Sequence, residues 1–184
     1  MSEHHHHHHH GEALGVALIV VSDRAADGRR PDKCEPALRA FLETRGQALA
    51  RVMVVPDEIP DIQRAIRELA DKERFDLILS AGGTGVAPRD VTPEATRPLI
   101  ERETPGLPEA MRAASMAVTP YAMLSRGLAG FRGASLIINL PGSPKAAVEN
   151  LAAVFDAVAH GVGKAKGDPT DCAPIPARKK EEPR

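Results

Sequence analysis

The feature that most constrains the fold is a series of short, continuously apolar runs separated by helical patterns. Residues 14–21 read LGVALIVV, and residues 135–140 read SLIINL. Runs of this length without alternating polar side chains are typical of strands that are buried on both faces. Two further strands are predicted at residues 48–55 and 76–80. Because helical patterns lie between these runs, the sequence predicts an α/β fold in which helices cover both faces of a mostly parallel sheet.

The helices are predicted from apolar side chains that recur every three or four residues. After Pro60, the side chains of Ile62, Ala65, Ile66 and Leu69 fall on one helix face. Similar patterns predict the remaining helices at residues 35–44, 93–102, 108–116 and 144–160. Residues 121–125 and 128–131 are predicted as short strands, which would form a hairpin.

The length of the chain and its changes in composition predict one domain between two terminal segments. Residues 1–11 read MSEHHHHHHHG, which is an expression tag. The domain is expected to span residues 12–163, because a chain of this size is typically a single domain. In residues 164–184, glycine, proline, lysine and glutamate replace large apolar side chains, so a flexible tail is expected there.

The composition excludes several classes of function. A net charge of −1, no Trp and one Tyr give no basic or aromatic surface for nucleic acid. No apolar stretch is long enough to span a membrane, so a cytoplasmic protein without a membrane or nucleic-acid partner is expected. Seven of the eight histidines lie in the tag, which leaves His160 alone and argues against a histidine metal site or triad. Cys34 and Cys172 form neither a disulfide framework nor a zinc motif.

The strongest local signal is the segment GGTGVAPRD at residues 82–90, directly after a predicted strand. Closely spaced glycines let backbone amides approach an anion, and a threonine hydroxyl adds a donor. The predicted anion-binding residues are Gly82, Gly83, Thr84 and Gly85. Arg89 is predicted to pair with a phosphate and Asp90 to hold a divalent cation. The alternatives are a simple connecting turn and, for Arg89, a structural ion pair.

Three other loops follow strands at the same expected edge of the sheet. The Pro-Asp-Glu sequence at residues 56–58 is either an acidic turn or the source of a second metal ligand, Asp57. Residues 141–145 read PGSPK, which is either an ordinary helix start or a second anion site. Residues 22–24 read SDR and are interpreted as a strand-end cap with a solvated ion pair.

Taken in order, these motifs resemble one known family. The segments SDR, PDE, GGTGVAPRDVTPEAT, LSR and NLPGSPK resemble the Mog family of molybdopterin adenylyltransferases in molybdenum-cofactor biosynthesis, which is related to MoaB and to the gephyrin and plant Cnx G domains. The resemblance covers residues 15–160. It implies a three-layer αβα sandwich, assembly as a homotrimer, and transfer of AMP from ATP to molybdopterin with Mg²⁺. The chain departs from the family pattern at Ala26, Cys34 and Glu35.

The resemblance also implies roles for individual residues. Asp57 and Asp90 match two aspartates that are held to be essential in this family, so both are expected to be catalytic and to hold the metal. Binding of the pterin is implied for Ser125, Arg126, Asn139, Pro141, Gly142, Ser143 and Lys145. A molybdenum-insertion protein is the downstream partner that such an enzyme would supply.

The implied reaction needs no general base. The terminal phosphate of molybdopterin has a second pKa near 6, so at neutral pH it is already largely a dianion. Catalysis would consist mainly of positioning and charge neutralisation. Two alternatives remain open: a non-catalytic, MoaB-like or scaffold protein that binds the pterin, and a nucleotide-phosphate hydrolase that uses the same loop.

Overall fold

A six-stranded, mostly parallel sheet forms the centre of the computed structural model, which describes residues 13–167. The strand order is β2-β1-β3-β6-β5-β4. The first four strands in this order are parallel to one another. Strand β5 is antiparallel to its neighbour β6, and β4 is antiparallel to its neighbour β5. The strands are β1 (Val16–Val21), β2 (Leu49–Val55), β3 (Leu77–Ala81), β4 (Arg102–Glu103), β5 (Ala129–Arg132) and β6 (Ser135–Leu140).

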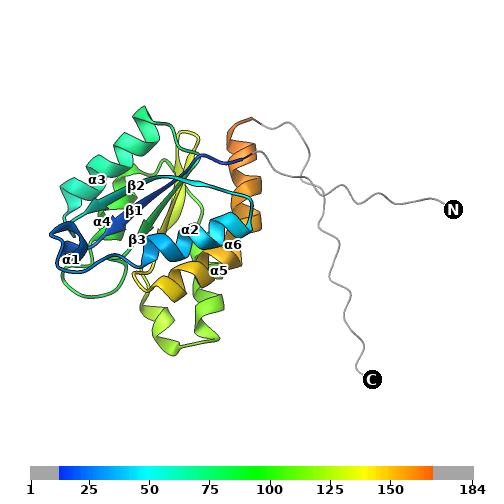
Figure 1. Ribbon diagram of the computed structural model, residues 1–184. Helices are drawn as coiled ribbons and strands as arrows, with labels where there is room; N and C mark the ends of the chain where they lie inside the picture. Colours follow the sequence, from blue (N-terminus) through cyan, green and yellow to red (C-terminus); the bar gives the residue numbers. More distant parts are fainter. Residues whose placement is uncertain (1–12, 168–184) are drawn as a thin grey trace, which may run out of the picture.

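Helices cover both faces of this sheet (Figure 1). One face carries α2 (Cys34–Thr44), α5 (Gly106–Met116) and α6 (Pro144–Ala165), and the other carries α3 (Ile59–Arg67) and α4 (Thr92–Thr96). Short helical turns complete the chain: α1 (Asp23–Ala26), η1 (Glu68–Lys72), η2 (Arg97–Leu99) and η3 (Pro120–Leu124). The arrangement confirms the predicted three-layer α/β/α architecture.

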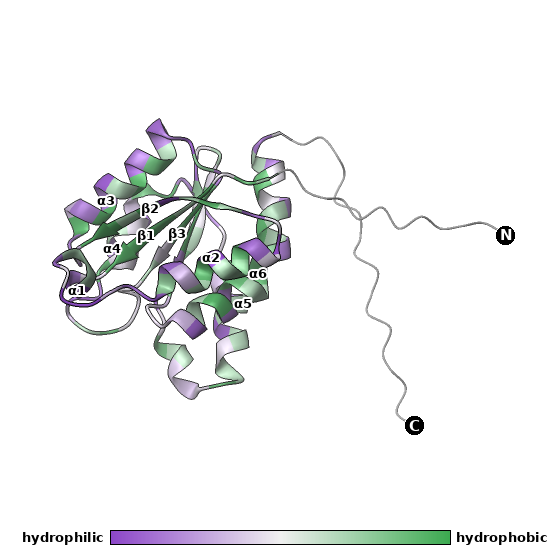
Figure 2. Cartoon of the chain, viewed as in Figure 1, coloured by the Kyte–Doolittle hydropathy of each residue, from purple (hydrophilic) through white to green (hydrophobic). Residues whose placement is uncertain are grey.

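Strand β1 explains why its sequence is apolar at every position. The side chains of Leu18 and Val20 pack toward α2 and α6, whereas those of Ile19 and Val21 pack toward α3. All six residues of β1 are buried, as expected for a strand covered on both faces. Figure 2 shows the same division, with apolar strands between helices whose outer faces are hydrophilic.

Three predicted elements differ from the structure. Residues 121–125 do not form a strand, because Pro120 begins the 3₁₀ turn η3 and the Thr119 side chain accepts a hydrogen bond from the Tyr121 N–H. The helix predicted at 93–102 ends with η2 at Leu99, and the chain then turns into β4. Helix α6 continues to Ala165 and buries Val162, so it extends into the first residues of the predicted tail.

The remaining expectations about the ends of the chain lie largely outside the described residues. The predicted expression tag, residues 1–11, and most of the predicted tail, from residue 168 onward, are not described. Within residues 13–167, no helix combines the length and apolar character needed to cross a membrane.

Candidate active site

Four loops meet at one edge of the sheet, where the parallel strands β1, β2, β3 and β6 end. Because these strands are parallel neighbours, the residues that follow them lie side by side. Ser22 follows β1 and donates its backbone N–H to Val55 at the end of β2. Gly82 follows β3 and donates its N–H to Leu140 at the end of β6, at 3.1 Å. The structure therefore brings the predicted functional loops together.

The loop that follows β3, residues 82–90, is called the glycine loop here, and its first two glycines adopt backbone conformations that favour glycine. Gly82 has φ +113° and Gly83 has φ +63°. A Cβ atom added at Gly82 would lie 2.2 Å from the carbonyl oxygen of Val21. At Gly142, a Cβ atom would lie 3.3 Å from the Cα of Gly82. Glycine at positions 82 and 142 thus allows the ends of β1, β3 and β6 to approach until their backbone atoms are in contact.

A buried polar network beneath the loop fixes its conformation. Asn139, which is 1% exposed, donates its side-chain amide to Ser80 Oγ at 2.9 Å and to Thr96 Oγ1 at 3.1 Å. Thr96 Oγ1 donates to the Thr92 carbonyl at 2.7 Å, and Thr92 Oγ1 donates to the Gly82 carbonyl at 2.8 Å. The network links β3, β6 and α4 to the glycine loop. Thr92 therefore begins α4 but uses its hydroxyl to hold the loop, not to cap the helix.

Removing one hydroxyl from this network is expected to destabilise the fold. The variant Thr96→Val keeps the shape of the side chain but leaves the Asn139 amide without one acceptor. Loss of a buried hydrogen bond of this kind costs about 1–3 kcal/mol of unfolding free energy. Urea unfolding measures the cost. Thr96→Ser keeps the hydroxyl and should lose only about 1 kcal/mol for the missing methyl group; equal losses in both variants would contradict the role of the network.

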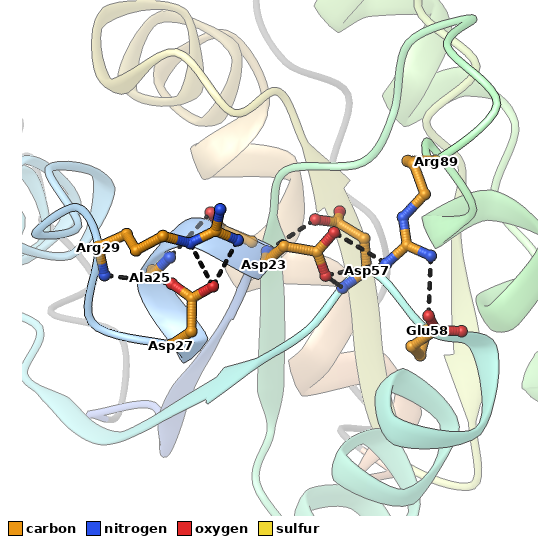
Figure 3. Close-up of polar contacts among 8 residues, drawn as sticks. Asp23, Ala25, Asp27, Arg29, Asp57, Glu58 and Arg89 are labelled. Carbon is orange, nitrogen blue, oxygen red and sulfur yellow. Dashed lines mark hydrogen bonds and ion pairs between the residues drawn. The ribbon is translucent and has the colours of Figure 1, made fainter.

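Two aspartates from different strand ends hold one another in place (Figure 3). The Asp23 N–H donates to Asp57 Oδ2 at 2.8 Å, and the Asp57 N–H donates to Asp23 Oδ1 at 3.0 Å. Arg89 donates from Nη2 to both carboxylate oxygens of Asp23, at 2.9 and 2.8 Å, and from Nη1 to Glu58 Oε1 at 2.8 Å. The structural ion pair that was the alternative for Arg89 is thus present. The partner of Asp23 is Arg89, not the neighbouring Arg24.

The two aspartates differ in their electrostatic environment. The pKa of Asp57 is raised above its ordinary value, mainly because burial disfavours the charged form and because Asp23 and Asp90 lie nearby. The pKa of Asp23 is lowered by its hydrogen bonds from Asp57 and Arg89. Within residues 13–167, no ion pair is formed by Asp57 itself. A carboxylate held in this way is charged at a cost, which a bound cation would relieve.

The variant Asp57→Asn is expected to be at least as stable as the parent at neutral pH. An amide oxygen can still accept the hydrogen bond from Asp23, while the cost of burying the charge disappears. A raised pKa in the folded state means that this cost grows as pH rises through the folded pKa and is absent below the unfolded value of 3.8. Melting temperatures at pH 7 and pH 3.5 measure the effect. The variant should have a higher melting temperature than the parent only at pH 7. A lower melting temperature than the parent at pH 7 would contradict the view that Asp57 is charged at a cost.

Asp90 approaches the glycine loop from the other side. Its Oδ2 accepts the Ala87 N–H at 2.8 Å and lies 2.8 Å from the position of a Cβ atom at Gly85. Asp57 Oδ1 lies 3.3 Å from the corresponding position at Gly83. The two carboxylates therefore flank the glycine loop. Within the described part of the chain, no group of three or more His, Cys, Asp or Glu side chains could hold a metal ion.

Two cavities open on either side of the glycine loop. The larger, of about 630 Å³, is lined by Asp90, Thr84 and Gly85 and by apolar side chains of α5 and η3. The smaller, of about 370 Å³, is lined by Asp57 and Asp23 and by the segment that joins α1 to α2. Gly83 and Gly142 line both. The two cavities therefore meet between the glycine loop and the loop that follows β6.

The predicted site residues divide into those that line a cavity and those that support one. The larger cavity is lined by the predicted pterin-binding residues Ser125, Pro141, Gly142, Ser143 and Lys145. Three other predicted residues do not line either cavity. Asn139 lies in the network beneath the loop, and Arg89 holds Asp23. Arg126 donates to the carbonyls of Gly85 and Asp90 and pairs with Glu94.

Cys34 joins two of the loops. Its Sγ donates to the Gly142 carbonyl at 3.3 Å, which connects the first turn of α2 to the loop after β6. Burial raises the pKa of the thiol to about 11, so it remains protonated and is a poor nucleophile at neutral pH. Asp32 caps the same helix by accepting the N–H groups of Cys34 and Glu35. In contrast, Ser143 precedes α6 without a side-chain capping bond.

Sequence reasoning missed several residues of the site. Ser80, Thr92 and Thr96 appear in the sequence as ordinary strand and helix residues, although each is fully buried beside the glycine loop. The signal that was available is polarity within otherwise apolar elements, since buried hydroxyl groups need partners. Asp23 gave a weaker signal, because its partners Asp57 and Arg89 are distant in the sequence.

Comparison with known protein families gives one match that covers most of the chain. Residues 17–160 match the family model described as "Probable molybdopterin binding domain". The chain is 45% identical over 148 residues to a molybdopterin adenylyltransferase of Haemophilus influenzae, a match that covers 78% of this chain and 74% of that protein. It is 40% identical over 176 residues to gephyrin of Dictyostelium discoideum, covering 90% of this chain but only 24% of gephyrin. The chain thus spans about a quarter of this longer relative.

Solved structures show the same likeness. The molybdopterin biosynthesis enzyme MoaB of Thermus thermophilus has 48% sequence identity and a TM-score of 0.80, covering 86% of this chain and 99% of MoaB. The Mog protein of Mycobacterium ulcerans has 38% identity and a TM-score of 0.77, covering 83% of this chain and 99% of that protein.

Proposed function

The chain belongs to the family of molybdopterin-binding domains, and from this premise we propose that it is a molybdopterin adenylyltransferase of molybdenum-cofactor biosynthesis. The enzyme would transfer AMP from ATP to the terminal phosphate of molybdopterin and release pyrophosphate. The observation that carries the proposal is the pair of carboxylates, Asp57 and Asp90, on either side of a glycine loop between two cavities. The name of the Haemophilus influenzae relative supports the same activity.

The residues present fit a magnesium ion that the substrate helps to bind. Mg²⁺ is usually held by one or two carboxylates together with water and phosphate oxygens, not by a complete protein cage. Asp57 uses Oδ2 for the hydrogen bond from Asp23, and its Oδ1 faces Gly83. Asp57 and Asp90 would hold the ion, which when bound neutralises charge on the phosphates of ATP.

The reaction does not require a side chain to transfer a proton. A phosphate oxygen of molybdopterin attacks the α-phosphorus of ATP, a new P–O bond forms, and the bond to the oxygen that bridges to the β-phosphorus breaks. Pyrophosphate leaves with that oxygen. Because the attacking phosphate is already largely a dianion at neutral pH, no side chain needs to remove a proton. This suits a site whose residues are glycines, aspartates and hydroxyl groups.

The chain's own residues would act by positioning and by charge. Backbone amides at Gly82, Gly83 and Gly85 would bind phosphoryl oxygens, and the Thr84 hydroxyl would add a donor. Arg89 would act indirectly, because its guanidinium holds Asp23, which in turn holds Asp57. Ser125, Ser143 and Lys145 in the larger cavity would contact molybdopterin. A homotrimer and a downstream molybdenum-insertion protein are further parts of this proposal.

Pyrophosphate release tests the proposal. With ATP and Mg²⁺, the protein should release pyrophosphate only when molybdopterin is added, at one pyrophosphate per molybdopterin adenylylated. Molybdopterin binding without pyrophosphate release would instead identify a non-catalytic binding protein. Release from ATP without molybdopterin would identify a hydrolase. Either result would overturn the proposal.

A further inference from the structure

The smaller cavity differs from the larger one in the charge at its rim. The segment that joins α1 to α2 forms one wall and is hydrophilic (Figure 2). Three basic side chains line the cavity: Arg24 of α1, and Arg30 and Lys33 of this joining segment. All three are exposed. Within residues 13–167, none of the three forms an ion pair or a side-chain hydrogen bond.

Three acidic side chains line the same cavity, namely Asp23, Asp32 and Asp57. Asp23 is bound by Arg89, and Asp32 accepts two backbone N–H groups at the start of α2. Within residues 13–167, neither Asp57 nor Asp32 forms an ion pair, but Asp32 uses both carboxylate oxygens for those two N–H groups, whereas Asp57 accepts one hydrogen bond, through Oδ2. Three unpaired cations and two carboxylates without a cationic partner therefore line the cavity, and of the two carboxylates Asp57 is the one with an oxygen available to a metal ion. This balance of charge fits a polyphosphate with a divalent cation better than it fits a neutral ligand.

The basic side chains of the larger cavity, in contrast, have partners within the described residues. Lys145 lies 3.8 Å from Glu149, and Arg112 donates to the Gly127 carbonyl at 3.2 Å. Much of the remaining lining is apolar, with Met111, Leu124 and Val118 among its side chains. The larger cavity thus suits the organic part of a ligand, whereas free positive charge is concentrated at the smaller one.

We propose that the smaller cavity binds the β- and γ-phosphates of ATP, and hence the leaving pyrophosphate, through Arg24, Arg30 and Lys33. The inference rests on the proposed function, because it assigns one end of that substrate. The α-phosphorus would lie near Gly83 and Gly142, where the two cavities meet and where a phosphate held in the larger cavity can reach it. The three cations would neutralise charge that develops on the leaving pyrophosphate.

Binding measurements with three probes test this subsite. The double variant Arg30→Gln/Lys33→Gln is titrated calorimetrically, in the presence of Mg²⁺, with ATP, inorganic pyrophosphate and AMP. Loss of two exposed charge-assisted contacts should weaken binding of ATP and pyrophosphate about tenfold. AMP lacks the two outer phosphates, so its affinity should change less than about twofold. Arg29→Gln removes a charge from the same segment, but Arg29 pairs with Asp27 and does not line the cavity; this control should bind all three probes like the parent.

The outcomes separate this inference from the proposed function. Unchanged binding of ATP and pyrophosphate by the double variant would overturn the subsite, and so would an equal loss for AMP. If the subsite result is obtained but molybdopterin-dependent pyrophosphate release is absent, the subsite stands and the adenylyltransferase proposal falls. If adenylylation occurs but the double variant discriminates between ATP and AMP like the parent, only the subsite is wrong.

Discussion

Replacement of Asp90 by asparagine is expected to lower the rate of adenylylation at least about a hundredfold while molybdopterin binding remains close to that of the parent. An amide oxygen is a weaker ligand for Mg²⁺ than a carboxylate, so charge on the phosphates of ATP would be poorly neutralised. The fold should survive, because the amide oxygen can still accept the Ala87 N–H that Asp90 accepts. Pyrophosphate release measures the rate, and titration with molybdopterin measures binding.

Asp156→Asn is the matched control for this variant. Asp156 is an exposed carboxylate on α6 that makes only a 3.4 Å contact with Arg45. Its replacement removes the same charge without touching either cavity, and turnover should be unchanged. Turnover by Asp90→Asn within about threefold of this control would remove Asp90 from the catalytic machinery.

Replacement of Gly82 by alanine is expected to produce the largest loss of stability among single substitutions in the glycine loop. The new Cβ atom would collide with the Val21 carbonyl, which is backbone and has no rotamer to change, and φ +113° is unfavourable for alanine. Strain of this kind costs roughly 2–4 kcal/mol of unfolding free energy. In a domain of this size, the melting temperature should fall by roughly 5–12 °C. Thermal unfolding followed by circular dichroism measures the shift.

Gly46→Ala isolates the part of this cost that comes from the collision. Gly46 has φ +68° at the end of α2, with no atom within 4 Å of a Cβ position. Alanine there should cost only about 1 kcal/mol, because the strain is conformational alone. If both variants lost the same stability, the close approach of β1 to the glycine loop would not be the reason for glycine at position 82.

The sheet was predictable because local patterns alone determine most of it. Strand β1 is apolar at every position since both its faces are covered, and α6 repeats apolar residues along its inner face. The elements that were predicted wrongly depend on distant contacts. Strand β4 forms only because residues 102–103 pair with β5, and Gly130 provides the space, since a Cβ there would lie 2.6 Å from the Arg102 carbonyl. A strand of two residues is too short to show a local sequence pattern from which this pairing could be predicted.

The site was predictable to the extent that it lies in compact motifs. The glycine loop and its aspartate are contiguous in the sequence, and Asp57 was identified because of the family resemblance. The supporting contacts were not predictable, because each joins distant segments. Arg89 binds Asp23 across 66 positions, and Asn139 binds Ser80 across 59. The sequence predicts that Arg89 and Asn139 contact ligands; their contacts with Asp23 and Ser80 are what the structure adds.

In the proposed enzyme, Asp57 and Asp90 would hold one divalent cation together with the phosphates of ATP. Electron paramagnetic resonance of Mn²⁺, titrated with a non-hydrolysable ATP analogue present, tests it most directly. We expect one tightly bound Mn²⁺ per chain that requires the analogue, with comparable loss of affinity in Asp57→Asn, in Asp90→Asn and in the double variant. Binding of Mn²⁺ by both single variants with the affinity of the parent would contradict it.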